Sequence, residues 1–150
     1  MNGEYRNTVD EKGRLMIPPK IREQLESVTE LYLTKSPDKS LWLFSKKDFD
    51  DLNSKVNYGP LSLFDKDSRI LDMTVIAPAR EIELDKTGRL SIPQIFREYA
   101  ELNPKEECVI LGSLTHVEIM SAANHEALME EYRSKIGSAG DNLAKNRMDK

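Results

Sequence analysis

The chain has 150 residues, of which 39% are hydrophobic and 32% are charged, and its net charge is −4. This length fits one domain or two small halves that share a core, and the composition is typical of a soluble globular protein. No apolar run approaches the roughly 20 residues of a membrane-spanning helix, no targeting segment is visible, and one cysteine excludes an internal disulfide. We therefore expect a cytoplasmic protein without a membrane partner. Nucleic-acid binding by this acidic chain would need cations gathered on one face.

The first half of the chain opens with a predicted β-hairpin. Asp10 can accept hydrogen bonds from the backbone amides just after it, and Gly13 permits a positive φ, so residues 10–13 predict a tight turn. Alternating residues precede the turn and an extended run follows from Arg14, which places the turn at the tip of the hairpin. Pro18 ends the second strand and suits the start of a helix. The elements expected next are a helix over residues 19–25, strands over 31–33 and 41–44, and a helix after the N-cap residue Ser45.

The second half repeats this order. The run Asp10-x-x-Gly-Arg-Leu-x-Ile-Pro-x-x-x-Arg-Glu returns from Asp85, with eight residues identical at a constant offset of 75 positions. A unit of about 50 residues buries too little apolar surface to be comfortably stable alone. We therefore expect the two units to share one β core across a pseudo-two-fold axis. The elements expected in the second half are strands over 81–84 and 89–92, a helix over 94–102, strands over 108–111 and 117–120, and a helix over 125–136.

Composition divides the chain into four parts. Residues 57–76 are polar and turn-rich and are predicted to link the repeats, so that residues 1–56 form the first repeat and 77–136 the second. Residues 137–150 are charged and have few apolar side chains, which predicts a mobile tail.

The doubled turn carries the most specific chemistry. Arg14 and Arg89 follow the turn glycines, where a buried core position is not expected for an arginine. Asp10 and Asp85, four residues earlier, can accept hydrogen bonds from the guanidinium groups and hold them in one direction. A rigid arginine fork on a two-stranded ribbon suits bidentate contact with phosphate or with guanine in the major groove. The same pairs could instead only brace a tight turn, and residue types alone leave both interpretations open.

Catalysis finds little support in the sequence. Asp10 and Asp85 could face each other as acid and base, but an arginine four residues after each would keep both carboxylates ionised. Cys108 lies in an apolar run that predicts a buried strand residue. His116 and His125 have neither a neighbouring histidine nor metal-ligand spacing. We therefore predict a protein that is not an enzyme, with no metal site and no cofactor.

The doubled motif resembles the MraZ family of bacterial transcriptional regulators, within the SpoVT/AbrB-like superfamily. The resemblance implies an α+β, mainly β fold of two tandem AbrB-like halves. These halves, of the swapped-hairpin or double-split β-barrel type, would form one pseudo-two-fold core with helices packed outside. The matching stretches cover nearly the whole chain and are residues 10–25, 31–33, 41–44, 79–99 and 109–119.

The resemblance also implies a function. Members of the family are expected to form ring-like homo-oligomers, an octamer or similar, that bind double-stranded DNA. The implied targets are repeated promoter sites of the division and cell-wall gene cluster, the protein's own operon included, which would make the protein nucleoid-associated. An alternative is an AbrB-like antitoxin or transition-state regulator, which uses the same hairpin but also grips a partner protein. The segment after Ile136 has few large apolar residues, and this disfavours a toxin partner.

Carried over by motif, the resemblance makes the first turn the main DNA contact, because Thr87 stands in the second turn where Lys12 would be. Arg22 and Arg97, at matched positions on the short helices, are expected to brace the hairpins through a partner such as Glu23, or to contact another subunit, rather than to read bases. The DNA-binding candidates are Lys12, Arg14, Lys86, Arg89 and, on the strand before the first turn, Arg6, with motif support from Asp10, Gly13, Asp85 and Gly88.

Overall fold

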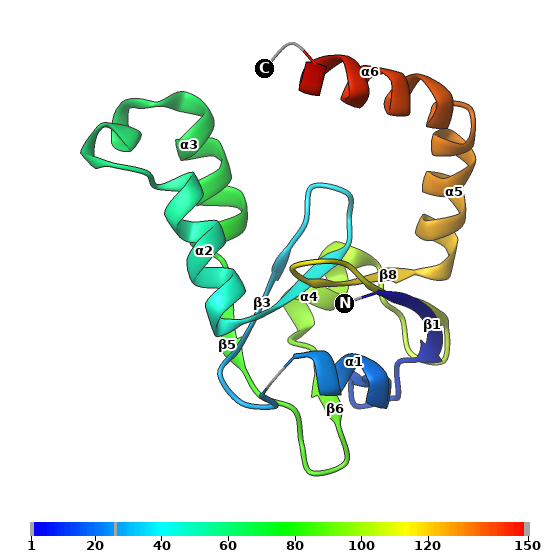
Figure 1. Cartoon of the computed structure of the whole chain (residues 1–150). Helices are drawn as coiled ribbons and strands as arrows, with labels where there is room; N and C mark the ends of the chain where they lie inside the picture. The colour runs from blue at the N-terminus through cyan, green and yellow to red at the C-terminus, as the bar shows by residue number, and fades with distance from the viewer. Residues whose placement is uncertain (1, 26, 149–150) are drawn as a thin grey trace.

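The structure is a computed structural model that describes residues 2–25 and 27–148. It is an α+β fold built mainly from antiparallel strands, as the sequence predicted (Figure 1). The strands are β1 (Gly3–Thr8), β2 (Arg14–Met16), β3 (Leu31–Lys35), β4 (Leu41–Ser45), β5 (Arg80–Ile82), β6 (Arg89–Ser91), β7 (Glu107–Gly112) and β8 (Val117–Ser121). The helices are α1 (Pro19–Gln24), α2 (Lys46–Val56), α3 (Lys66–Leu71), α4 (Gln94–Ala100), α5 (Ala122–Arg133) and α6 (Ile136–Met148), with a 3₁₀-helix η1 (Pro60–Phe64) and a π-helix η2 (Asp72–Ile76).

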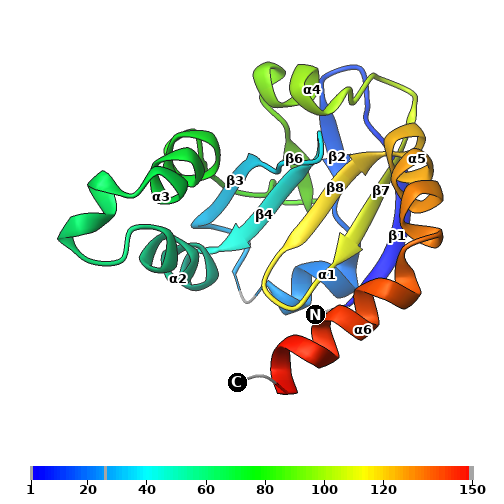
Figure 2. The same cartoon turned by 90° about the horizontal axis from the view of Figure 1, so that it is seen from above.

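The strands are exchanged between the two repeats. The six-stranded sheet has the order β1-β7-β8-β4-β3-β5, so β1 of the first repeat pairs with β7 of the second, and β5 of the second pairs with β3 of the first. The two remaining strands, β2 and β6, pair with each other in a separate sheet. The counterparts in the two repeats are β1 and β5, β3 and β7, and β4 and β8, and exchanging them gives the same order read from the other edge of the sheet. A pseudo-two-fold axis therefore passes between β4 and β8, at the middle of the large sheet (Figure 2).

One apolar core belongs to both repeats. Leu15 on β2 lies opposite Leu90 on β6, and both side chains are fully buried. The short helices contribute Ile21 from α1 and Phe96 from α4, which are buried in the same cluster. Burial of each such side chain contributes about 1.5–3 kcal/mol. Because these residues come in equivalent pairs, neither repeat has a complete core without the other.

The prediction of two local hairpins was wrong in its strand pairing. The first turn is closed, because the Asp10 amide donates to the Arg14 carbonyl at 2.9 Å and the Gly13 amide to the Asp10 carbonyl at 3.0 Å. The strands on either side of it, β1 and β2, nevertheless pair with β7 and β6 of the other repeat. An isolated two-stranded hairpin is marginally stable in water, whereas the exchanged strands lie over a shared core. Alternating residues predict that a strand exists, but they do not identify its partner.

Two helical arms rise from the same side of the sheets, in the upper left and upper right of Figure 1. We call residues 46–76 the first arm and residues 122–148 the second arm. Each begins at a serine that caps its helix, as predicted for the first and matched in the second. The Ser45 hydroxyl accepts from the Asp48 amide at 3.2 Å, and the Ser121 hydroxyl accepts from the Asn124 amide at 3.0 Å.

The segment predicted as a polar, turn-rich linker is largely helical. Asp65 caps α3 by accepting from the Asp67 amide at 3.1 Å. At the end of the segment, Val75 and Ile76 are buried in a second apolar cluster with Phe44 and other residues of β4 and α2. These few apolar contacts hold the helices in place. Polar and turn residues dominate the segment, so its sequence did not indicate the helices.

Helix α6 occupies most of the segment predicted to be a mobile tail. It runs from Ile136 to Met148 and contains Gly137 and Gly140, two residues that weaken a helix interior. The described side chains of this helix are exposed. The composition of this segment did not indicate a helical backbone, and the mobility of the tail stays a prediction.

Candidate nucleic-acid interface

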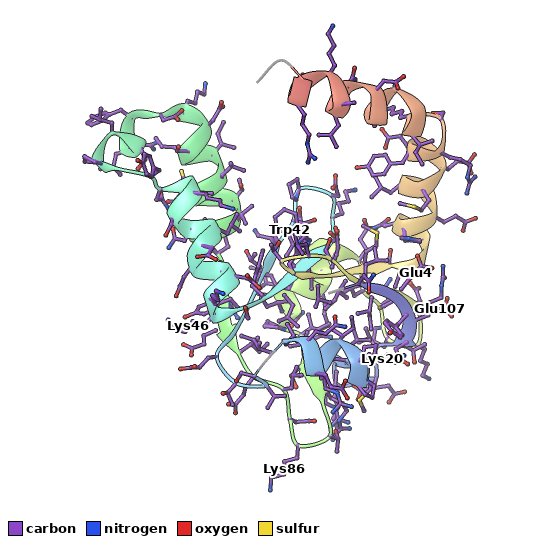
Figure 3. The ribbon with its side chains drawn as sticks, viewed as in Figure 1. Glu4, Lys20, Trp42, Lys46, Lys86 and Glu107 are labelled. Carbon is purple, nitrogen blue, oxygen red and sulfur yellow. The ribbon has the colours of Figure 1, made fainter. Side chains whose placement is uncertain are left out.

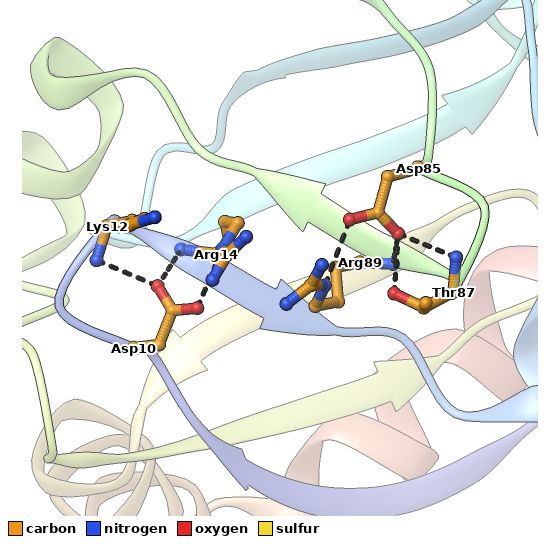
Figure 4. Close-up of polar contacts among 6 residues, drawn as sticks. All are labelled: Asp10, Lys12, Arg14, Asp85, Thr87 and Arg89. Atoms are coloured by element: carbon orange, nitrogen blue, oxygen red, sulfur yellow. Dashed lines mark hydrogen bonds and ion pairs between the residues drawn. The ribbon is translucent and has the colours of Figure 1, made fainter.

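The first turn fixes Arg14 through the carboxylate of Asp10. One carboxylate oxygen, Oδ1, accepts hydrogen bonds from the backbone amides of Lys12 and Arg14, each at 2.9 Å. The other, Oδ2, accepts from the Arg14 Nε–H at 2.8 Å (Figure 4). Gly13 has a φ of 78°, in the left-handed region that favours glycine. The predicted aspartate–arginine pairing is therefore present, and the carboxylate also holds the turn backbone.

The second turn has the same arrangement with one addition. Asp85 Oδ1 accepts from the backbone amides of Thr87 and Arg89 at 2.9 and 3.0 Å, and Oδ2 accepts from the Arg89 Nε–H at 2.9 Å. The Thr87 hydroxyl donates a further bond to Asp85 Oδ1 at 2.8 Å (Figure 4). The residue that replaces Lys12 thus turns back to the aspartate and braces its own turn.

Both aspartates are held in the ionised form. Hydrogen bonds lower the pKa of Asp10, chiefly the one from the Arg14 backbone amide. The pKa of Asp85 is lowered further, chiefly by the Arg89 backbone amide and then by the Thr87 hydroxyl. An acid–base pair needs one carboxyl group with a raised pKa, so these two carboxylates are suited to orienting arginines rather than to proton transfer.

The two arginines lie on one face of the small sheet. In the β2–β6 pair, Arg14 is opposite Ser91 and Met16 is opposite Arg89, while Leu15 faces the core. Directly opposite residues share a face, and neighbours along a strand point to opposite faces. Arg14 and Arg89 therefore lie together on the outer face. Within the described residues, each guanidinium is bonded only through Nε, which leaves both terminal nitrogens of each fork for a ligand.

The turn lysines add positive charge beside this face. Lys12 and Lys86 are exposed, and Figure 3 shows Lys86 directed away from the protein at the end opposite the helical arms. The neighbouring carboxylate of Glu11 is paired with Lys105 at 3.2 Å. That ion pair matches the negative charge of Glu11 next to the first turn and leaves the net charge of the chain unchanged.

Arg6 is placed apart from this arrangement of turn residues. It lies on β1, and its Nη1 donates to the carboxylate of Glu107 on β7 at 2.8 Å. This bond occupies a terminal nitrogen of Arg6, whereas Arg14 and Arg89 are bonded to their aspartates through Nε. Of the predicted DNA-binding residues it has the weakest support from the structure.

The arginines of the short helices are braces, as predicted, but not through Glu23. Arg22 Nε–H donates to the Ile17 carbonyl at 3.0 Å, and Arg97 Nε–H donates to the Ile92 carbonyl at 2.9 Å. Each bond joins a helix residue to a carbonyl five residues earlier, at the residue that directly follows β2 or β6. Their matched positions in the two repeats indicated a shared role. The partners could not be predicted, because every residue has a backbone carbonyl.

Other groups that could support chemistry are buried or dispersed. Burial raises the pKa of the Cys108 thiol to about 11, so the thiol is protonated and a poor nucleophile. His116 packs against Trp42 and Phe44, and burial lowers its pKa. His125 is buried, 3.6 Å from a carboxylate oxygen of Glu4. In the described ranges, no three histidine, cysteine or acidic residues come together as metal ligands.

The described helices include none that is long and apolar enough to cross a membrane.

Comparison with known proteins gives one family for both repeats. The family model for MraZ protein, described as antitoxin-like, matches residues 1–74 and again residues 75–146. A transcriptional regulator MraZ of Treponema denticola is 40% identical over 147 residues, which cover 95% of this chain and 96% of the relative.

Other organisms have similar proteins of the same name. The one from Treponema pallidum is 38% identical over 141 residues, with 94% of this chain and 92% of the relative covered. The one from Ligilactobacillus salivarius is 35% identical over 147 residues, with 98% and 96% covered. These matches extend over both turns and the shared core, so the chain belongs to the MraZ family of transcriptional regulators.

Proposed function

We propose that this regulator binds double-stranded promoter DNA through the outer face of the β2–β6 sheet. The observation that carries the proposal is the pair of forks on that face, Arg14 and Arg89. Each is fixed by an aspartate, and its terminal nitrogens have no hydrogen-bond partner among the described residues. A fixed guanidinium fork matches a phosphate or the O6 and N7 edge of guanine, and a two-stranded ribbon fits the major groove. The proposed targets are repeated promoter sites of the division and cell-wall gene cluster, its own operon included.

The first turn is proposed as the main contact. Lys12 has no bonded side-chain partner among the described residues, so its ammonium group is available for a phosphate. At the matched position the Thr87 hydroxyl is occupied by Asp85. Lys86 and Arg89 then act as secondary contacts, and Arg6 as a marginal one. Arg6 would have to exchange Glu107 for a phosphate, which adds little net electrostatic gain.

We also propose that several copies act together in a closed ring, an octamer or similar, in the cytoplasm and at the nucleoid. The helical arms expose large apolar side chains that a single copy leaves uncovered, which supports contacts between copies. In the first arm these are Tyr58, Leu61, Leu63 and Phe64, and in the second arm Ile136 and Leu143. One turn neutralises few phosphates, so linked copies would gain affinity from a high effective concentration.

A protein partner is the second candidate role, and it needs no catalysis or cofactor. The second arm and β1 line a groove of about 730 Å³ whose apolar residues include Met129, Tyr132 and Ile136. The antitoxin-like description of the family agrees with such a partner. In the ring proposal the same groove is covered by a neighbouring copy. Native mass measurement separates these roles, because a ring gives a multiple of the chain mass without any second protein.

The DNA-binding proposal is tested with a labelled duplex from the region upstream of the protein's own gene. Fluorescence anisotropy at low and high salt should show tight binding that weakens steeply as salt rises. Arg14→Ala should bind much more weakly while it keeps the native mass. The matched control is Arg147→Ala, an exposed arginine on the second arm, which should bind like wild type. An oligomeric Arg14→Ala variant with wild-type affinity would exclude the proposed contact.

A further inference from the structure

The arginines of the short helices are the part of the doubled motif that the proposed DNA contact leaves unused. Arg22 and Arg97 are half-buried, and each is anchored to its own repeat by its Nε–H bond to Ile17 or Ile92. Such an anchor fixes the plane of the guanidinium group.

Each guanidinium plane lies against the turn glycine of the opposite repeat. A Cβ atom added to Gly13 would be only 2.7 Å from Cζ and Nε of Arg97, and one added to Gly88 would be 2.7 Å from Nε of Arg22. These separations are well inside van der Waals contact, so only glycine lets the arginine pack so closely. Both glycines are buried as a result.

Backbone hydrogen bonds cross between the repeats at the same two places. The Ile92 amide donates to the Gly13 carbonyl at 2.9 Å, and the Ile17 amide donates to the Gly88 carbonyl at 3.1 Å. Arg97 and Ile92 thus hold the first turn, and Arg22 and Ile17 hold the second. We call each arrangement a clamp. Both clamps run from one repeat to the turn of the other.

We propose that Arg97 is the positioning residue for Arg14, and that Arg22 is the positioning residue for Arg89. The proposal rests on the proposed DNA-binding function of the turns. Gly13 directly precedes Arg14, so a shift of the glycine moves the backbone that carries the Arg14 guanidinium group. Binding groups must be held to about 0.5 Å to keep their contacts. The second repeat therefore controls the main DNA contact of the first repeat, although its own turn contributes less.

The competing explanation is direct contact of Arg22 and Arg97 with DNA through their terminal nitrogens. The two roles differ in charge and in shape. A phosphate contact mainly needs a positive charge, which lysine retains. Packing on a glycine needs the flat guanidinium group, which lysine lacks.

The first test uses the protein without DNA. Amide hydrogen exchange should be faster at Lys12 and Arg14 in Arg97→Ala, by roughly tenfold, with little change at Thr87 and Arg89. Arg22→Ala should show the reverse pattern. Thermal melting of both variants checks that the fold is retained. Equal acceleration of both turns, or faster exchange only in the variant's own repeat, would overturn the clamp.

The second test measures anisotropy with the promoter duplex. Arg97→Ala should weaken binding more than Arg22→Ala, and Arg97→Lys should be as weak as Arg97→Ala. Adding Arg97→Ala to Arg14→Ala should cause no further loss, because the fork that Arg97 positions is already absent. Additive losses, or full binding by Arg97→Lys, would assign a direct contact and overturn the proposal. If the wild-type protein does not bind the duplex, the proposed DNA-binding function is wrong. The hydrogen-exchange pattern would then still show whether the clamp exists.

Discussion

The two turns have the same scaffold and leave different groups free. In the first, Asp10 accepts three hydrogen bonds and the Lys12 side chain extends from the turn. In the second, Asp85 accepts four, because Thr87 adds its hydroxyl. The two repeats thus share the geometry that orients an arginine. They differ in the residue two positions after the aspartate, which is the cation Lys12 in the first turn and the bracing Thr87 in the second. Geometry and charge are separable properties of this turn, and each can be tested independently.

The largest expected effect concerns the scaffold that the turns share. Leu15→Ala and Leu90→Ala should each lower the free energy of unfolding by about 2–5 kcal/mol, because both side chains are fully buried. The two losses should be similar, since the residues lie opposite each other across the pseudo-axis. Urea denaturation followed by circular dichroism measures them. A large loss for one and a negligible loss for the other would mean that the repeats do not share the core equally.

The next effect separates the turns themselves. Arg14→Ala should cost about 1–3 kcal/mol of promoter binding per engaged turn, and Arg89→Ala should cost less. The difference should persist when both variants have the same native mass and melting temperature. Titration of the duplex at one fixed salt concentration gives both values. Equal losses would show that the two forks are used alike despite the change from Lys12 to Thr87.

A gain-of-charge variant sharpens the same comparison. Thr87→Lys gives the second turn the cation of the first and removes the hydroxyl bond to Asp85. The dependence of log affinity on log salt should become steeper by about 1 for each second turn that reaches DNA. Thr87→Ala is the control, because it loses the hydroxyl without adding a charge. An unchanged slope for Thr87→Lys would mean that the second turn stays away from the phosphates.

The smallest effect is the pH dependence of stability. Both aspartates have a lowered pKa in the folded protein, so each favours folding above the ordinary value of 3.8 and loses that contribution as the pH falls through the folded value. The lowering is greater for Asp85. Below pH 3.8, Asp85→Asn should therefore weaken the acid dependence of unfolding more than Asp10→Asn. Both groups are exposed, so solvent keeps the effect small. A larger change for Asp10→Asn would contradict the assigned role of Thr87.

The sequence predicted where strands, helices and turns lie better than it predicted which strands pair with one another. Local signals were sufficient for the turns, the capping residue Ser45 and the strand around Cys108, because each depends on neighbouring residues. The exchange of β1 and β2 between repeats depends on contacts far apart in the chain, and only the family resemblance implied it. The helices in 57–76 escaped prediction for a similar reason, since they are held by distant residues such as Phe44.

At the candidate site, the contacts within each turn were predictable from the sequence, whereas the contacts between the repeats were not. The spacing of Asp10 and Arg14 predicted their ion pair, which is present. The roles of Gly13 and Arg97 were predicted only in part, because the positive φ of the turn was taken as the sole reason for the glycine. Its second requirement, room for an arginine from the other repeat, appears only when the two repeats are folded together.

Covalent fusion of the two repeats gives the proposed DNA-binding surface a direction. Two identical chains around a true dyad must present identical turns, and they read the same bases in both directions along a palindrome. Here one chain supplies both halves of the β2–β6 sheet, so Lys12 and Thr87 can differ. With the first turn as the main contact, the surface has a leading and a trailing end. If the proposed contact holds, this surface would distinguish the two orientations of its DNA site, whereas a symmetric dimer would not.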